Sequence, residues 1–233
     1  MVELPISITV DGATVSGIID RPENCRPGVT PGLVLGHGAN NDLTHPLLAI
    51  VAEHLADTGV ANVLRFNFPY MQRGASSPDR LTVLEETLRR AHDVLFDDPD
   101  CAPGPLFLGG KSLGARVAAS LVSRHHEAEG LLASGLIFLG YPLHAPGGRD
   151  NLKLEPLRRI DVPSLFVVGT RDPFCDIELL KPIVAGLDMP GTLHLVPEGG
   201  HSFEMPKSSG RTDEESFHDV AAVVAGFIEA HTA

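Results

Sequence analysis

The stretch that decides the fold is GPLFLGGKSLGAR, residues 104–116, because two different kinds of site share its central letters. The segment GKS at 110–112 is how a phosphate-binding loop finishes. The longer segment GKSLG at 110–114 fits G-x-S-x-G, the sharp turn that presents a nucleophilic serine. The surrounding residues must decide between a nucleotide site and a nucleophile.

A phosphate-binding loop requires a glycine five residues before its Gly-Lys pair. That position is Pro105, and the nearest glycine, Gly104, is one residue too far away. Residues 106–108 are apolar and predict a strand rather than a loop of exposed backbone N–H groups. The pattern therefore disfavours nucleotide binding.

A nucleophile turn requires a strand that ends, turns sharply and starts a helix at once. Here the apolar run PLFLG ends at the turn, and LGARVAASLV has the spacing of a helix. Gly110 and Gly114 flank Ser112 two residues away on each side, where larger residues would collide. The bare motif also arises by chance in a chain with 24 glycines, and serine is a common helix cap. Partner residues for Ser112 are therefore needed to decide between catalysis and capping.

A serine hydroxyl becomes a nucleophile when a base takes its proton and an acid orients that base. On a strand-turn-helix fold the order along the chain is Ser, acid, His, and the site forms at the carboxyl ends of the strands. Asp172 follows an apolar strand predicted at 164–169, and His201 follows one predicted at 192–197. We therefore expect Ser112 to be the nucleophile, His201 the base and Asp172 the acid.

Each of these partners has another interpretation. Asp172 precedes Pro173 and fits a turn or the cap of the next helix. Asp176 could replace it as the acid, and His201 could be an ordinary surface histidine, one of 11 in the chain. The expected loop positions favour catalysis over these alternatives.

The oxyanion hole requires two backbone N–H groups near the serine oxygen. Leu113 supplies one as the residue after the nucleophile, and Ala39 is the expected second donor, with Asn40 as the alternative. His37 and Asn40 lie in this loop beside the expected pocket, and the His37 ring is expected to shape the loop by hydrogen bonding. Four further residues are expected either to line the pocket or only to pack: Tyr70, Met71, Tyr141 and Phe174.

No metal or cofactor is expected from the histidines. His125-His126, His144 and His194 show no paired metal spacing, and no HExxH occurs. The expected partner is a small-molecule acyl substrate, and the sequence makes no prediction of oligomeric state.

The rest of the chain alternates between strand and helix patterns. A hairpin is predicted around Asp11-Gly12, followed by strands at 32–38, 61–69, 105–110, 134–140, 164–169 and 192–197. Helical spacing occurs at 46–58, 81–97, 113–122, 177–187 and 213–231, the last with a capping box from Thr212 to Glu215. The pattern predicts one α/β domain over residues 1–233. Its sheet has about eight strands, mostly parallel, with helices on both faces.

The composition excludes several classes of partner. With 30 acidic against 18 basic residues, the net charge of −12 disfavours binding to nucleic acid and to anionic membranes. No apolar run approaches the roughly 20 residues of a membrane span, and the first residues show no secretory signal pattern.

The three cysteines, Cys25, Cys101 and Cys175, are widely spaced along the chain. This spacing predicts that they form no disulfide framework and that the protein resides in a reducing compartment. These features together predict a soluble, cytoplasmic protein.

Six stretches together resemble the α/β-hydrolase superfamily: HGAN at 37–40, FPYMQRG at 68–74, GGKSLGAR at 109–116, GYPLH at 140–144, GTRDPF at 169–174 and GGHSF at 199–203. The match resembles a lidless branch near the dienelactone hydrolases. That branch includes the testis-expressed hydrolase-like proteins and a subunit of the non-specific-lethal chromatin complex. The resemblance implies the same Ser112, Asp172 and His201 roles. Dienelactone hydrolases use cysteine at the elbow, so Ser112 argues against that exact activity.

The segment where such folds carry a lid, residues 141–162, is too short for one. An open site favours small esters, thioesters or short peptides over long-chain lipids. We therefore expect a serine hydrolase that works through an acyl-enzyme. The alternative is a binding or scaffold protein without turnover, suggested by the resemblance to a chromatin-complex subunit.

Overall fold

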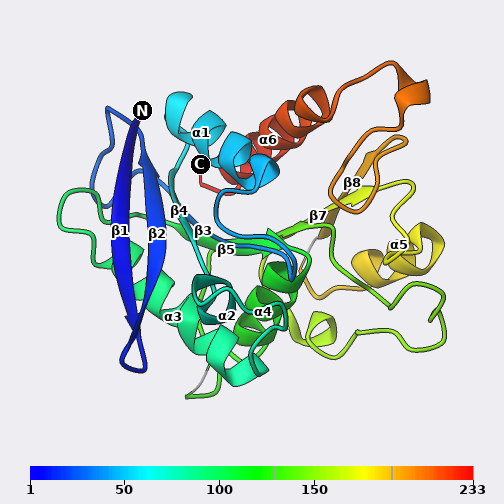
Figure 1. Ribbon diagram of the computed structural model, residues 1–233, viewed down its shortest axis with the longest axis horizontal. Helices are drawn as coiled ribbons and strands as arrows, with labels where there is room; N and C mark the ends of the chain where they lie inside the picture. Colours follow the sequence, from blue (N-terminus) through cyan, green and yellow to red (C-terminus); the bar gives the residue numbers. More distant parts are fainter. Residues whose placement is uncertain (129, 190, 233) are drawn as a thin grey trace.

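The computed structural model of the protein describes residues 1–128, 130–189 and 191–232. Within these residues eight strands form one sheet in the order β1-β2-β4-β3-β5-β6-β7-β8 (Figure 1). The strands are β1 (Val2–Val10), β2 (Ala13–Arg21), β3 (Gly32–Gly36), β4 (Asn62–Phe66), β5 (Leu106–Lys111), β6 (Gly135–Leu139), β7 (Ser164–Gly169) and β8 (Gly191–Val196). The helices are α1 (Pro46–Asp57), α2 (Pro69–Gln72), α3 (Leu81–Phe96), α4 (Leu113–Val122), α5 (Ile177–Ala185) and α6 (Asp213–Ala230), with short 3₁₀ turns at η1 (Leu157–Arg159) and η2 (Lys207–Ser209).

The predicted sheet is confirmed in number and direction of strands. β1 and β2 form an antiparallel hairpin, β2 pairs antiparallel with β4, and the strands from β4 to β8 in the sheet order pair parallel. The hairpin turns at Asp11 and Gly12, which both have positive φ (47° and 80°). Two consecutive positive φ values are what a tight two-residue hairpin turn requires.

Two apolar cores lie on the two faces of the sheet. In β3, Leu33 and Leu35 point into the core under α1 and α6, while Val34 points into the core under α3 and α4. Figure 1 shows α1 and α6 on one side of the sheet and α3 and α4 on the other. A strand buried on both faces must be apolar throughout, which explains why these strands read as continuous apolar runs.

The helix boundaries follow local chemistry. The predicted capping box at α6 is confirmed, because the Thr212 side chain accepts from the Glu215 N–H and the Glu215 side chain accepts from the Thr212 N–H. The sequence pattern predicts no helix between the strand at 61–69 and the helix at 81–97, but Pro69–Gln72 forms the short helix α2. Proline is favoured in a first helical turn, where its missing N–H costs nothing.

The prediction of no disulfide is wrong for two of the three cysteines. Cys25, in the loop after β2, is bonded to Cys101, in the loop after α3, with Cα atoms 6.1 Å apart. Cys175 is a free, buried thiol. The two bonded residues are 76 positions apart, so their proximity depends on the sheet order rather than on any local pattern. The expectation of a reducing compartment, which rested on cysteine spacing, loses its basis.

A buried ion pair ties the hairpin to the parallel part of the sheet. Arg65 on β4 donates from Nε and Nη2 to the two carboxylate oxygens of Asp20 on β2, at 2.8 and 2.9 Å. A third donor, Nη1, reaches the Leu43 carbonyl oxygen at 3.1 Å. Both charged side chains are almost fully buried. The sequence patterns did not predict this pair.

The connection from β6 to β7 contains only the turn η1, so the site beyond the strand ends has no lid, as predicted. In the part of the chain that the structure describes, no helix has both the length and the apolar character needed to cross a membrane.

Candidate active site

Ser112 occupies the turn between β5 and α4. Its backbone has φ 51° and ψ −103°, a conformation that L-residues rarely adopt and that functional turns retain. Its N–H donates to the Leu139 carbonyl oxygen at 3.0 Å, which fixes the turn to β6. A Cβ atom at Gly110 or at Gly114 would overlap the carbonyl oxygen of Gly36 on β3. Close packing of β3 against the turn therefore demands both glycines.

The structure brings the three predicted catalytic side chains together. His201 Nε2 lies 2.9 Å from Ser112 Oγ, and His201 Nδ1 lies 2.8 Å from Asp172 Oδ2. The Asp172 side chain is fully buried, whereas the His201 side chain is 16% exposed. A buried carboxylate that accepts from Nδ1–H leaves Nε2 free to accept the serine proton. The arrangement can therefore activate a hydroxyl.

Asp176, the alternative acid, is directed elsewhere. Its side chain accepts from the Glu178 N–H at 2.9 Å and so caps α5, and it also pairs with Arg149 at 3.2 Å. Asp172 is instead oriented by the backbone, because its Oδ1 accepts from the Phe174 N–H at 2.8 Å. Each aspartate thus has a separate set of partners.

Ala39 and Leu113, the two expected oxyanion donors, both line a pocket of about 320 Å³ with Ser112. Among the described residues, no backbone carbonyl accepts a hydrogen bond from either N–H group. Asn40, the alternative donor, is exposed and is not part of this pocket wall. Two unused N–H groups beside a serine are suited to bind a developing oxyanion.

His37 lies behind the oxyanion loop and does not line the pocket. Its ring is buried, with Nδ1 2.8 Å from the Gly38 carbonyl oxygen and Nε2 3.0 Å from the Phe68 N–H. Because Nε2 must accept from that N–H, Nδ1 carries the proton and donates to Gly38. Burial lowers the pKa of His37 to about 4, so the ring is neutral. The residue shapes the loop, as the sequence suggested.

Tyr70 holds the same loop from α2. Its hydroxyl donates to the Ala39 carbonyl oxygen at 2.8 Å, and burial raises its pKa to about 12. The carbonyl oxygens of residues 38 and 39 both accept hydrogen bonds from side chains behind the loop. These bonds anchor the loop on the side of α2. Met71, also on α2, packs against the apolar core and lines no part of the serine pocket.

Phe174 and Tyr141 contribute to the cavities in different ways. The Phe174 ring lines the serine pocket and packs on the His201 ring, with centroids 4.4 Å apart. Tyr141 is buried and lines a neighbouring cavity, where its hydroxyl donates to the Lys153 carbonyl oxygen at 3.0 Å. Burial raises the pKa of Tyr141 to about 12.

Lys111 precedes the nucleophile and is buried, with only 4% of its surface exposed. A Cβ atom at Gly38 would lie 3.3 Å from Lys111 Nζ and 3.6 Å from Ser112 Cβ, so the ammonium lies close to the oxyanion loop. No side chain or carbonyl of the described residues accepts a hydrogen bond from it. Burial lowers the pKa of Lys111, and Glu204 and Asp172 partly oppose this.

Other residues of the serine pocket were not singled out as pocket residues from the sequence. Pro78, Pro142, His144 and Lys153 all line it. His144 is held in one tautomer, since its Nε2 accepts from the Asp176 N–H at 3.1 Å and Nδ1 faces the Ala145 carbonyl oxygen at 2.9 Å. Arg116 also lines the pocket, four residues after Ser112 on α4.

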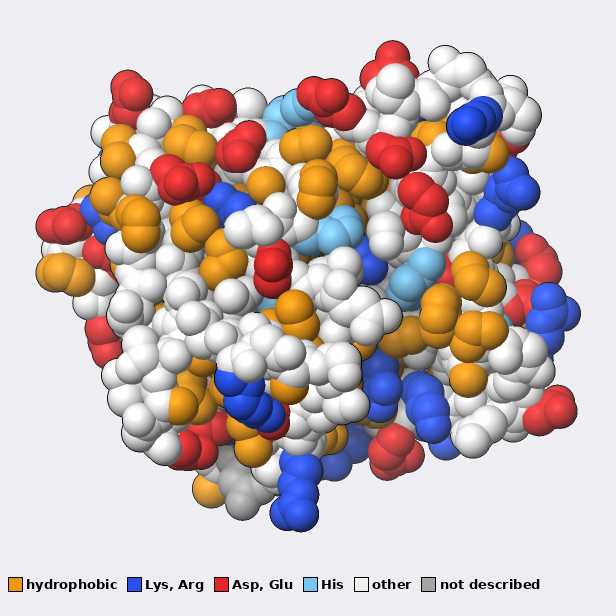
Figure 2. Space-filling model, in the orientation of Figure 1, with side chains coloured by type: hydrophobic (Ala, Val, Ile, Leu, Met, Phe, Trp, Pro, Cys, Tyr) orange, Lys and Arg blue, Asp and Glu red, His pale blue; other side chains and the backbone are white. Residues whose placement is uncertain are grey.

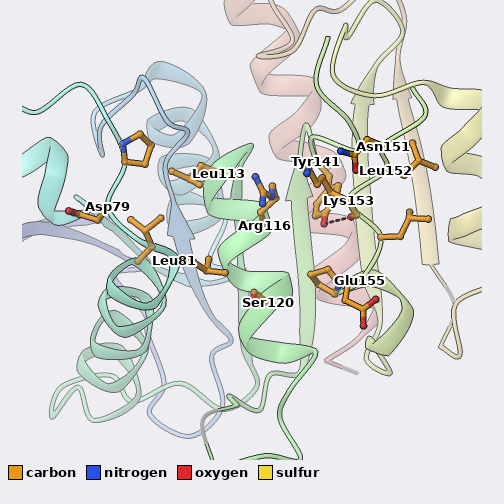
Figure 3. A pocket seen from close by; sticks show the side chains of 14 residues that line it. Asp79, Leu81, Leu113, Arg116, Ser120, Tyr141, Asn151, Leu152, Lys153 and Glu155 are labelled. Atoms are coloured by element: carbon orange, nitrogen blue, oxygen red, sulfur yellow. Dashed lines mark hydrogen bonds between the residues drawn. The ribbon is translucent and has the colours of Figure 1, made fainter. Parts of the chain in front are cut away.

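A second cavity of about 440 Å³ adjoins the serine pocket along α4 (Figure 3). Four residues line both cavities: Pro78, Leu113, Arg116 and Lys153. Figure 2 shows a hollow near the middle of this face of the molecule with histidine at its rim and a group of Lys and Arg side chains below it.

Comparisons with known proteins agree with this fold. A family model described as an alpha/beta hydrolase domain matches residues 30–229. A dienelactone hydrolase from Anabaena variabilis has a TM-score of 0.74 at 20% identity, over 98% of this chain and 97% of that chain. A serine hydrolase without a lid from Xanthomonas campestris has a TM-score of 0.72 at 18% identity, over 98% and 94%. At these identities the likeness shows the fold alone.

Among curated proteins, the chain is similar to a Mycobacterium tuberculosis protein with a provisional name as a phosphoribosyl transferase. The two are 27% identical over 203 residues, which make up 86% of this chain and 42% of the relative. The chain therefore spans less than half the length of that relative. From the match of the family model over most of the sequence, we conclude that the chain belongs to the alpha/beta hydrolase domain family.

Proposed function

We propose that the protein is a serine hydrolase that cleaves an acyl bond of a small ester, thioester or short peptide. The observation that supports this most is the pair of distances at His201, 2.9 Å to Ser112 Oγ and 2.8 Å to Asp172 Oδ2. Base, nucleophile and acid would then act as one unit. We also propose that the chain belongs to the lidless branch that its motifs resemble.

The first half-reaction forms an acyl-enzyme. His201 Nε2 takes the proton of Ser112 Oγ while Oγ bonds to the carbonyl carbon of the substrate. The carbonyl oxygen becomes an oxyanion and accepts hydrogen bonds from the N–H groups of Ala39 and Leu113. The tetrahedral intermediate collapses as His201 gives its proton to the leaving alcohol, thiol or amine. Asp172 stabilises the imidazolium that exists between these two proton transfers.

The second half-reaction repeats these steps with water. His201 takes a proton from water, and the hydroxide oxygen bonds to the acyl carbon. The Ser112–acyl bond breaks, and His201 returns the proton to Ser112 Oγ. The product acid leaves and the enzyme is restored.

The size of the pocket supports a small substrate. The serine pocket holds about 320 Å³ and is bounded by short or rigid side chains such as Ala39, Pro78 and Pro142. A cavity near the lower end of the usual range accommodates a short acyl group. The absence of a lid leaves no apolar cover for a long lipid chain.

The test is covalent labelling with a fluorophosphonate, measured as the intact mass of the protein. We expect one adduct on the wild type and none on Ser112→Ala. Ser7→Ala, which removes an exposed serine on β1, is the matched control and should label fully. p-Nitrophenyl acetate and butyrate should be hydrolysed by the wild type and the control only.

Equal labelling of wild type and Ser112→Ala would show that Ser112 is not the nucleophile. A folded wild type that neither labels nor hydrolyses any ester of the series would support the alternative, a binding protein that retains the fold without turnover.

A further inference from the structure

The serine pocket and the second cavity adjoin each other along α4, and we call the two together the groove. Their shared boundary consists of Pro78 and Leu113 together with two cations, Arg116 and Lys153. A substrate held at Ser112 and extended from the serine pocket into the second cavity would pass this boundary and its two cationic side chains.

Both cations are directed at this boundary. The Arg116 N–H donates to the Ser112 carbonyl oxygen at 3.2 Å, so Arg116 lies one helical turn beyond the nucleophile on the same face of α4. Lys153 is fixed through its backbone, because its carbonyl accepts from Tyr141 and its N–H donates to the Leu143 carbonyl oxygen at 2.7 Å. Figure 3 shows the Arg116 and Lys153 side chains entering the same space from α4 and from the loop after β6.

The charge at this boundary is not compensated. No carboxylate of the described residues forms an ion pair with Arg116 or Lys153. Of the residues that the structure describes, those lining the serine pocket include these two cations and no acidic side chain. Two acids, Asp79 and Glu155, line the second cavity, and Asp79 is already paired with Arg73. In a chain of net charge −12, this boundary attracts an anion and would repel a cationic substrate.

We propose, on the basis of the hydrolase function above, that the substrate is an ester or thioester of a short dicarboxylic acid. Its free carboxylate binds Arg116 and Lys153 while its other carboxyl carbon is attacked by Ser112. One helical turn is about 5.4 Å long, a distance that a chain of two or three methylene groups can span. Succinyl and glutaryl esters have this length.

The test compares mono-p-nitrophenyl glutarate with its neutral methyl ester, which has the same chain and leaving group. We expect the wild type to favour the charged ester in kcat/KM by about tenfold or more, since hydrogen bonds to charged groups contribute that much. The ratio should fall toward one in Arg116→Gln/Lys153→Gln and should fall with added salt in the wild type. Arg158→Gln, a substitution of an exposed arginine outside the groove, is the control and should keep the ratio.

The outcomes separate the two proposals. A wild type that hydrolyses both esters at equal kcat/KM, or a ratio that survives in the double variant, overturns the dicarboxylate proposal and leaves the hydrolase intact. A wild type that hydrolyses neither ester and does not label with the fluorophosphonate overturns both.

A second and independent feature lies at the other end of α4. His125 and His126 follow the helix, and Asp161 lies in the segment before β7. Asp161 Oδ2 is 3.5 Å from His125 Nε2 and 3.4 Å from His126 Nε2, and the three atoms all lie within 4.8 Å of one another. From the sequence no metal is expected here, because the histidines show no paired metal spacing; Asp161 is remote from them along the chain.

The hydrogen bonds around this cluster favour a cation between its members. His125 Nδ1 lies 3.0 Å from the Val122 carbonyl oxygen; with its proton there, the Nε2 lone pair faces the carboxylate. Asp161 Oδ1 is buried and has no partner among the described residues. The spacings of 3.4 and 3.5 Å are close to the edge of a tetrahedron about a zinc ion, about 3.3–3.4 Å for bonds of 2.0–2.1 Å.

We infer that His125, His126 and Asp161 bind a divalent transition-metal ion such as Zn²⁺, with solvent completing the coordination.

Titration calorimetry with ZnCl₂ should show one equivalent bound to the wild type that is missing in His126→Ala. The His126 side chain is 81% exposed, so this variant should fold. His218→Ala, which removes an exposed histidine on α6, is the control and should bind like the wild type. Cobalt should give the intense visible absorption of a tetrahedral site only where His126 is present, and equal binding to wild type and His126→Ala overturns the inference.

Discussion

The buried ring of His37 accepts a hydrogen bond from the backbone N–H of Phe68 at 3.0 Å, and this contact fixes the loop that carries Ala39. Protonation of Nε2 would turn the acceptor into a donor and break the contact. Burial lowers the pKa of His37 from its usual 6.5 to about 4, so the ring keeps this acceptor at neutral pH.

The first prediction concerns stability in mild acid. Between pH 6.5 and about 4 the unfolded chain binds a proton at His37 and the folded protein does not, so the free energy of unfolding falls as pH falls. The contribution of His37 is roughly 3 kcal/mol across this window. Urea unfolding at several pH values should show a shallower pH dependence for His37→Gln than for the wild type. Parallel curves for the two proteins would contradict it.

A second prediction separates the two aspartates of the loop after β7. Asp172→Asn should lower kcat by about 10⁴, because an amide cannot hold His201 in the tautomer that accepts the serine proton. Asp176→Asn makes the same chemical change four residues away and should keep both the activity and the helix cap, since asparagine caps well. Ester hydrolysis by both variants is the measurement. A comparable loss in the two variants would show that the change acts through the loop rather than through His201.

Glycine spacing at the turn gives a third prediction. Gly114→Ala places a methyl group against the carbonyl oxygen of Gly36 and should strongly reduce stability and soluble yield. Gly226→Ala, inside α6, has no atom within 4 Å of the new Cβ and should stabilise the protein by about 0.5–1 kcal/mol. Thermal unfolding measures both. An unchanged midpoint for Gly114→Ala would mean that β3 can move away from the turn.

The fourth prediction concerns the buried pair of Arg65 and Asp20. Asp20→Asn leaves the buried guanidinium with only the half-exposed Glu3 carboxylate, 3.5 Å away, and should cost about 3 kcal/mol or more in the free energy of unfolding. Glu178→Gln removes one partner of the exposed pair with Lys181 and should cost less than about 1 kcal/mol. Denaturant unfolding of the two variants measures both losses in the free energy of unfolding. Similarly small losses for both would mean that water reaches Arg65.

The fifth prediction concerns Lys111, whose pKa is lowered by burial. Lys111→Met removes a buried charge that has no acceptor among the described residues and should raise the free energy of unfolding by about 1–4 kcal/mol at neutral pH. Between the lowered pKa and 10.5 the unfolded chain binds more protons, so the wild type should gain stability as pH rises through this window. The advantage of the variant should therefore shrink in alkaline solution. A variant less stable than the wild type at neutral pH would refute the prediction.

The fold could be predicted because its signals are local. Each signal spans only a few residues of the sequence: an apolar run, a helical spacing, or the glycines around Ser112. Together these local signals predicted the strands, the turn and the hairpin. Asp172 and His201 were found because the carboxyl ends of neighbouring parallel strands meet at one edge. The structure places both of them beside Ser112.

Other features depend on which side a side chain faces after folding. Tyr70 was expected either to line the pocket or only to pack, yet its hydroxyl holds the loop backbone from behind, on the side of α2. The bond of Cys25 to Cys101 and the pair of Arg65 with Asp20 join segments that the sheet order brings together. No local pattern carries that order.

The register of β3 against β5 sets Gly36 opposite Gly110, directly before the loop of Ala39 and the turn of Ser112. The spacing between the N–H groups of Ala39 and Leu113 is therefore set by backbone pairing, which side-chain replacements in the groove do not alter. If the protein is the hydrolase proposed above, exchanging Pro78, Lys153 or Phe174 should change its substrate preference while these two N–H donors keep their positions.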